Sequence, residues 1–204
     1  MMKQTRNYEI LLLVVVVEII VIIISFVLAY FTKVNLISLL NISLKATITG
    51  LIFLVVLTVV NLLSVFILPR YIGFLRPLKE AYDEVSGLVI SLDPFSIVVI
   101  SLFSGVAEEL LFRGVVQTTW GIVLASLVFG LFHIGNKKTI QYGAYAILIG
   151  FYLGYLMIYT QSLWAPILVH VLNNAIAIPV MQWSYKKLKA QAPVEPVENN
   201  EPED

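Results

Sequence analysis

The chain has 204 residues, of which 59% are apolar and only 13% are charged. This composition is typical of a polytopic membrane protein and excludes an ordinary soluble domain. The 13 basic and 13 acidic residues cancel, so no basic patch suggests nucleic acid, and the lack of cysteine excludes disulfides and thiolate metal sites.

The N-terminal part of the chain predicts two membrane-spanning helices followed by a surface helix. Apolar runs of about 20 residues, the length that crosses a bilayer, occupy residues 10–31 and 47–68. The mixed run 76–84 predicts an amphipathic helix on the membrane surface, with Pro77 near its start. We therefore expect residues 1–92 to form a two-helix region with an amphipathic linker.

One carboxylate, Glu18, interrupts the first apolar run. Because a charge at membrane depth is costly, we expect Glu18 to be protonated or to pair with a polar group such as Asn61. No recognisable motif surrounds it, so a catalytic or substrate-contacting function is the less favoured interpretation.

The next part of the chain, residues 93–183, predicts four more helices and so completes an all-α membrane fold of about six helices. Asp93 and Pro94 are suited to the N-cap and first turn of the third helix. The four apolar runs are 95–116, 121–132, 139–160 and 162–183. After Ser184 the chain is first basic and then rich in proline and glutamate, which predicts a disordered tail over 184–204.

The third helix carries two adjacent glutamates and an arginine inside an otherwise apolar run, and charges at this depth indicate a functional site. On a helix, Glu109 and Arg113 share one face with the acid first, an orientation that favours an ion pair. Glu108 points about 100° away and has no partner in its own helix. The sequence thus predicts a structural ion pair between Glu109 and Arg113 and leaves Glu108 available for chemistry.

Helix geometry predicts that polar residues of three helices meet at one depth. If residues 119–121 form the turn of a helical hairpin, Glu108 and His133 each lie about 18–20 Å from that turn. His170 and Asn174 lie about 12 and 18 Å along the sixth helix, which approaches the same layer. We therefore expect these three helices to bring the four side chains toward one place.

Small residues recur at helical spacing on three of these helices and predict close helix contacts. They are Ser101 and Gly105 on the third helix, Ser126 and Gly130 on the fourth, and Ala146, Gly150 and Gly154 on the fifth. The stripe on the fifth helix contains no polar residue, so it is interpreted as a packing seam only.

Three motifs occur in order along residues 95–183, about half of the chain. Glu108 to Arg113 reads EExxxR, Phe129 to His133 reads FxxxH, and His170 to Asn174 reads HxxxN. This ordered set resembles the CAAX-protease and bacteriocin-processing (CPBP, or Abi) family of intramembrane proteases.

The resemblance implies a helical core around a polar cavity and an endopeptidase acting on a membrane-associated peptide or protein, for example a prenylated or bacteriocin-like precursor. It implies that Glu108 is the catalytic carboxylate and His133 its partner in activating water. His170 and Asn174 would stabilise the oxyanion. The resemblance does not identify the substrate, and it says little about the first two helices.

Zinc remains an alternative to metal-independent chemistry, because members of this family are often labelled metalloproteases. If zinc is bound, its ligands would be Glu108, His133 and His170, a legitimate catalytic set. The HExxH spacing of metalloproteases is absent from the sequence. We therefore favour glutamate chemistry with no cofactor.

Two other functions are compatible with the same residues. Glutamate and histidine chains also relay protons in transporters, although the sequence shows no inverted repeat of the kind that builds many transporters. A non-catalytic bacteriocin immunity or scaffold protein could use the cluster to bind a partner.

Lysine and arginine positions predict the orientation in the cell membrane. With the N-terminus inside, ten basic residues fall in cytoplasmic segments and three in the others, which together make the 13 of the chain. The three are Lys33, Lys45 and Arg113. We therefore expect a multi-pass protein with both termini in the cytoplasm.

Overall fold

The computed structural model describes residues 2–191, and this part of the chain folds into helices with no strand. Five helical segments in it are long and apolar enough to cross a membrane. They are built on α1 (Met2–Thr32), α3 (Leu44–Leu62), α5 (Pro94–Glu109), α8 (Ile140–Thr160) and α9 (Trp164–Gln191). The predicted all-α fold is confirmed.

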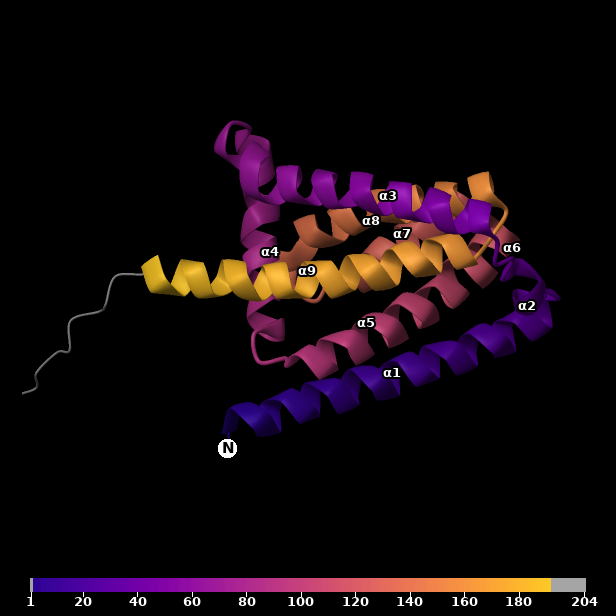
Figure 1. Cartoon of the computed structure of the whole chain (residues 1–204), viewed down its shortest axis with the longest axis horizontal. Coiled ribbons are helices and arrows are strands. Elements are labelled where there is room, and N and C mark those ends of the chain that lie inside the picture. The colour runs from indigo at the N-terminus through magenta and orange to yellow at the C-terminus, as the bar shows by residue number, and fades with distance from the viewer. Residues whose placement is uncertain (1, 192–204) are drawn as a thin grey trace, which may run out of the picture.

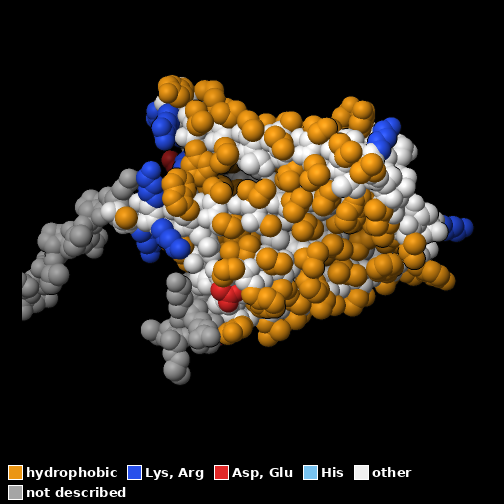
Figure 2. All heavy atoms as spheres, in the orientation of Figure 1, with side chains coloured by type: hydrophobic (Ala, Val, Ile, Leu, Met, Phe, Trp, Pro, Cys, Tyr) orange, Lys and Arg blue, Asp and Glu red, His pale blue; other side chains and the backbone are white. Residues whose placement is uncertain are grey.

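The long helices run alongside one another, and the start of α1 and the end of α9 lie at the same end of the bundle (Figure 1). Apolar side chains cover much of the visible face, while lysine and arginine gather toward the ends (Figure 2). This distribution suits a bundle whose middle faces lipid hydrocarbon.

The sixth apolar helix, α7 (Ile122–Phe132), is shorter than the others. Its 11 residues span about 16 Å, roughly half of the hydrocarbon core of a bilayer. It begins at Gly121, whose φ of +91° is a conformation that glycine adopts without strain. The predicted short fourth helix is therefore confirmed, and its end leaves His133 among the long helices.

Shorter elements connect the long helices. They are α2 (Leu36–Leu39), η1 (Leu63–Ile67), η2 (Leu68–Arg70), η3 (Gly73–Leu75), α4 (Arg76–Val89), η4 (Leu110–Gln117), α6 (Thr118–Trp120) and η5 (Lys137–Thr139). Two of them, η1 and η4, are π-helical continuations of α3 and α5. Such wider turns are often found at functional sites.

The predicted amphipathic helix exists as α4 and is longer than expected. It lies across the ends of the long helices in Figure 1. Leu78, Ala81 and Tyr82 are buried on its inner face. Because Tyr82 and Met181 of α9 belong to one apolar cluster, α4 closes this end of the bundle.

The helices α1 and α5 are parallel, and one pair of side chains aligns their first turns. The Asn7 amide donates to Asp93 Oδ2 at 2.9 Å, and the Asp93 backbone N–H donates back to Asn7 at 3.0 Å. As predicted, Asp93 is the N-cap of α5 and accepts from the Ser96 N–H at 2.7 Å. These hydrogen bonds from Ser96 and Asn7 hold the pKa of the Asp93 carboxyl below its usual range.

Glycines bring the helix backbones into direct contact, as the small-residue stripes predict. A Cβ on Gly130 of α7 would lie 2.6 Å from the Gly143 carbonyl oxygen of α8. A Cβ on Gly105 of α5 would lie 2.8 Å from the Val171 nitrogen of α9. These contacts leave no room for a side chain, so α5, α7, α8 and α9 form one tightly packed unit.

The prediction of a disordered tail from residue 184 is wrong for its first part. Helix α9 continues to Gln191, and Ser184 is buried. The run of lysines after it is helical because nothing interrupts α9 there: straight-chain residues favour helix, and the prolines come later. The rest of the predicted tail, residues 192–204, lies outside the described residues.

Candidate active site

The predicted ion pair between Glu109 and Arg113 is present at the centre of the bundle. Arg113 Nη1 donates to Glu109 Oε1 at 2.8 Å, and the two side chains are 0% and 1% exposed for Glu109 and Arg113 respectively. The guanidinium also lies over the Phe129 ring, with its Cζ atom 4.3 Å from the ring centroid. Because both side chains are fully buried, no solvent screens their charges, and all of their hydrogen-bond partners must come from the protein.

A third partner, which the sequence did not reveal, joins this pair. His170 Nδ1 lies 2.7 Å from the same Glu109 Oε1 atom. Because a carboxylate only accepts hydrogen bonds, Nδ1 of His170 carries the proton. Glu109 thereby fixes both the rotation and the tautomer of His170, and its function is wider than the ion pair predicted from the sequence.

The second histidine is oriented in the same way by a different acceptor. His133 Nδ1 lies 2.8 Å from the backbone carbonyl oxygen of Phe129, so this nitrogen also carries a proton. The other ring nitrogen, Nε2, is thus directed away from the backbone of α7. Both histidines therefore turn Nε2 toward the space between the helices.

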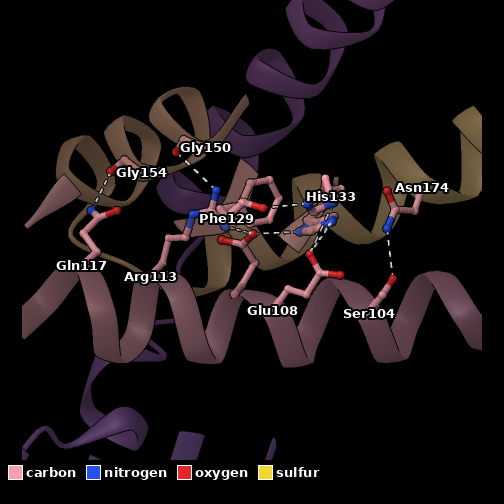
Figure 3. Close-up of polar contacts among 11 residues, drawn as sticks. Ser104, Glu108, Arg113, Gln117, Phe129, His133, Gly150, Gly154 and Asn174 are labelled. Carbon is pink, nitrogen blue, oxygen red and sulfur yellow. Dashed lines mark hydrogen bonds and ion pairs between the residues drawn. The ribbon is translucent and has the colours of Figure 1, made fainter. Parts of the chain in front are cut away.

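Glu108 lies opposite these two nitrogens. His133 Nε2 and His170 Nε2 are each 4.0 Å from Glu108 Oε2, and the sticks of Glu108 and His133 face each other in Figure 3. A separation of 4.0 Å is too long for a direct hydrogen bond and is wide enough for a water molecule to contact both atoms. Glu108 is 20% exposed, in contrast to the fully buried Glu109.

The fourth predicted residue, Asn174, lies beside this group without touching Glu108. Its amide donates to Ser104 Oγ at 3.1 Å (Figure 3), and Ser104 in turn donates to the Ile100 carbonyl oxygen at 2.8 Å. An amide nitrogen carries two N–H groups, so one donor of Asn174 remains available. The structure thus brings Glu108, His133 and His170 to one point and places Asn174 next to them.

The small-residue stripe on α8 does more than pack helices. Arg113 Nη2 donates to the Gly150 carbonyl oxygen at 3.3 Å, and Gln117 Nε2 donates to the Gly154 carbonyl oxygen at 3.0 Å (Figure 3). Backbone oxygens are reachable there because the glycines have no side chain. The interpretation of the stripe as a packing seam alone is therefore incomplete. Arg113 and Gln117 are four residues apart, and so are their acceptors Gly150 and Gly154, so the matching spacing is present in the sequence.

Glu18 is buried and 7% exposed, and its Oε2 atom has no hydrogen-bond partner among the described residues. The expected pairing with Asn61 is wrong, because Asn61 donates to Asn173 Oδ1 at 2.9 Å instead. The reason is position: α3 packs on α9 and α8, whereas α1 packs on α5. An unpartnered carboxyl in this environment is expected to be protonated.

Glu108, His133 and His170 are chemically suited to ligate zinc, but their arrangement does not fit a zinc ion. Each histidine Nε2 lies 4.0 Å from Glu108 Oε2, whereas ligand atoms around tetrahedral zinc lie roughly 3.3–3.4 Å apart for bonds of about 2.0–2.1 Å. Across residues 2–191, no three histidine, aspartate or glutamate side chains form a group that could hold a metal ion. As placed, the three donors are spread too widely for one zinc.

Comparison with known proteins agrees with the resemblance expected from the motifs. The family model for type II CAAX prenyl endopeptidase Rce1-like proteins matches residues 90–176, a segment that contains all three motifs. This match confirms the resemblance to CAAX proteases. Together with the long apolar helices, it identifies a multi-pass membrane protein with a CAAX-protease-like helical core.

Two curated proteins of Bacillus subtilis are also similar to the chain. "Uncharacterized protein YpbD" is 34% identical over 80 residues, covering 39% of this chain and 42% of that protein. "Putative membrane peptidase YdiL" is 28% identical over 102 residues, covering 46% of this chain and 40% of that protein. The chain thus spans about two fifths of the length of these relatives. No solved structure matches it.

The two glutamates should differ in their effect on stability. In Glu109→Gln, Arg113 and His170 lose the carboxylate that compensates them, and breaking a buried ion pair costs about 3–5 kcal/mol. Glu108→Gln should cost much less, since the imidazole nitrogens that face Glu108 Oε2 are 4.0 Å away and no hydrogen bond holds this carboxylate in the described chain. The thermal unfolding midpoint and the yield of monodisperse protein in detergent measure the difference, and equal losses in both variants would contradict it.

Proposed function

We propose that the chain, whose residues 90–176 match the Rce1-like family, is an intramembrane endopeptidase that hydrolyses a peptide bond of a membrane-associated substrate. One observation carries the proposal. Two imidazole Nε2 atoms lie 4.0 Å from one carboxylate oxygen, and the Nδ1 atom of each ring is already bound elsewhere. Such a group can hold and activate a water molecule, which is what hydrolysis requires.

Glu108 is the proposed general base. A water molecule held between Glu108 Oε2 and His133 Nε2 loses a proton to Glu108 as its oxygen attacks the carbonyl carbon of the substrate. When the carbon–nitrogen bond breaks, the proton passes by way of His133 Nε2 to the leaving amine. The second water proton stays with the new carboxyl group, so both residues return to their starting states.

His170 and Asn174 are the proposed donors to the oxyanion. Because His170 Nδ1 donates to Glu109, a second donation from Nε2 requires the imidazolium form, which the carboxylates of Glu109 and Glu108 stabilise. Asn174 adds the N–H that Ser104 does not use. A donor of this kind contributes about 3–4 kcal/mol to stabilisation of the transition state.

This proposal predicts that Glu108→Gln abolishes hydrolysis, with a loss of at least ~100-fold because general base catalysis contributes that much or more. Purified protein in liposomes would be assayed with internally quenched peptides, both unmodified and prenylated. Glu80→Gln, on the exposed face of α4, is the matched control and should keep full activity. Hydrolysis by Glu108→Gln at the control rate would refute the assignment of Glu108 as the base, whereas no hydrolysis by the wild-type protein would favour a scaffold or transport function.

We further propose that hydrolysis needs no metal ion, since the spacing of the three donors suits a bridging water and not zinc. Active protein should then contain zinc well below one ion per chain, and chelators should leave the rate unchanged. Metal content would be measured by mass spectrometry on the same preparation that is assayed. Stoichiometric zinc, with activity lost on chelation and restored by zinc, would show that the three residues act as ligands.

Both ends of the described chain are proposed to face the cytoplasm, because the basic residues favour that orientation. The chain has no cysteine, so single cysteines can be introduced without a background. Lys137→Cys and Ala190→Cys should react with an impermeant maleimide only after the cytoplasmic face is opened, whereas Lys45→Cys should react from outside. The reverse pattern would overturn the orientation.

A further inference from the structure

A cavity of about 120 Å³ lies beside the candidate active site. His133, His170 and Asn174 line one part of it, and α3, α4, α8 and α9 supply most of the remaining wall. The wall is mainly apolar, and the described residues that line it include no lysine, arginine, aspartate or glutamate. The cavity is therefore suited to an uncharged ligand that reaches the histidines.

Three polar side chains of this wall form a hydrogen-bonded chain that joins three helices. The Tyr145 hydroxyl of α8 donates to Asn61 Oδ1 of α3 at 2.7 Å, and Asn61 Nδ2 donates to Asn173 Oδ1 of α9 at 2.9 Å. We call Asn61, Tyr145 and Asn173 the amide cluster. Each of the two amide oxygens accepts one hydrogen bond in this chain, while the second N–H of Asn61 and both N–H groups of Asn173 have no acceptor among the described residues.

The amide cluster therefore has three N–H groups available to donate, and a hydrogen-bond acceptor is the ligand that suits them. A carboxylate would satisfy the donors, but the described wall contains no lysine or arginine, and the imidazolium proposed at His170 is already paired with Glu109 and Glu108. Burial of the carboxylate would therefore be costly. A neutral carbonyl oxygen meets the same donors without that cost. The chemistry of the cluster thus selects a peptide carbonyl over a free C-terminal carboxylate.

The position of the amide cluster on α9 indicates how far from the cleaved bond its substrate carbonyl would lie. Asn173 follows His170 by three residues on α9, which is about 4.5 Å along the helix axis. One residue of an extended peptide covers about 3.3 Å. A carbonyl held by the cluster would therefore belong to a residue one or two positions from the bond presented to His170.

The apolar part of the cavity limits the neighbouring side chain. Leu62, Phe66 and Met181 contribute to this part of the wall. A cavity of roughly 150 Å³ in another protein holds one benzene ring, so 120 Å³ suits one side chain of the size of leucine or valine.

We propose that the amide cluster positions the substrate by binding a backbone carbonyl of a neutral, extended peptide stretch, with one apolar side chain of that stretch in the cavity. This inference rests on the proposed peptidase function and deepens it, because it states what the site selects. Asn61 lies outside the segment that matches the Rce1-like family, so the family match does not by itself assign the cluster.

The test compares three variants on one probe, a neutral internally quenched peptide with a single central leucine and blocked ends. Asn61→Leu and Tyr145→Phe should each raise KM by roughly 3- to 10-fold, the effect of losing one neutral hydrogen bond, and leave kcat within about twofold. Thr58→Val is the matched control: Thr58 also lines the cavity, but its hydroxyl donates to the Leu54 carbonyl of its own helix. Equal KM values for Tyr145→Phe and the control would overturn the proposal.

Two further measurements keep the test decisive. If Asn61→Leu folds poorly, Tyr145→Phe decides, because it removes only a hydroxyl and keeps the ring. If the wild-type protein cleaves no peptide, the peptidase function fails, and binding of the same peptide to Glu108→Gln still tests the cluster. A weaker Kd on adding Tyr145→Phe to Glu108→Gln supports a peptide site, and an unchanged Kd refutes it.

A separate binding measurement tests the preference for a neutral peptide stretch. The same peptide with a free carboxylate one residue beyond the leucine should bind at least ~10-fold more weakly than its amide, because the described wall has no lysine or arginine to pair with it and His170 is already paired with Glu109. Equal binding of the acid and the amide would contradict the selection of a neutral carbonyl.

Discussion

The fully buried carboxylate of Glu109 is the constraint on which the rest of the site depends. One of its oxygens accepts from Arg113 at 2.8 Å and contacts His170 Nδ1 at 2.7 Å. An uncompensated charge at this depth would be shed or would unfold the protein, so these partners must be held in place. The same contacts fix α9 against η4 and α5, and they turn His170 Nε2 toward Glu108. Stability and orientation of the site therefore come from one group of charges.

Close backbone contact is what makes this arrangement possible. Arg113 reaches the Gly150 carbonyl of α8 because a glycine stands there, and Gly105 lets α5 touch α9 directly. The short α7 contributes in another way: it ends at Phe132, so that the next residue, His133, faces Glu108. Helix length and residue size thus place three functional groups from three helices within reach of one water molecule.

Helix periodicity alone predicted much of this site. The i, i+4 spacing predicted the pair of Glu109 with Arg113, and equal distances from the turn near Gly121 predicted that Glu108 and His133 would be neighbours. Both arguments work because the rise of a helix per residue is constant. The contact of Glu109 with His170 could not be predicted in this way, because it depends on how far α9 is rotated about its axis relative to α5.

Which helices pack against each other was a second feature that the sequence did not predict. Asn61 was expected to be available to Glu18, but α3 and α1 pack on different helices, and Asn61 joins Asn173 and Tyr145 instead. The π-helical turns of η4, which widen the backbone around Arg113, have no signature in the residue pattern. The helical continuation of α9 to Gln191 was missed because charge and later prolines were given more weight than the helix propensity of residues 184–191.

The account rests on Glu108 as a base that activates water and not as a nucleophile. Single-turnover hydrolysis in ¹⁸O-labelled water tests this difference directly, because only a covalent route can transfer an oxygen from the carboxylate to the product. If Glu108 acts as a base, the new carboxyl group contains one ¹⁸O from the first turnover and the Glu108 side chain stays unlabelled. Unlabelled product in the first turnover, with ¹⁸O appearing in Glu108, would contradict the account.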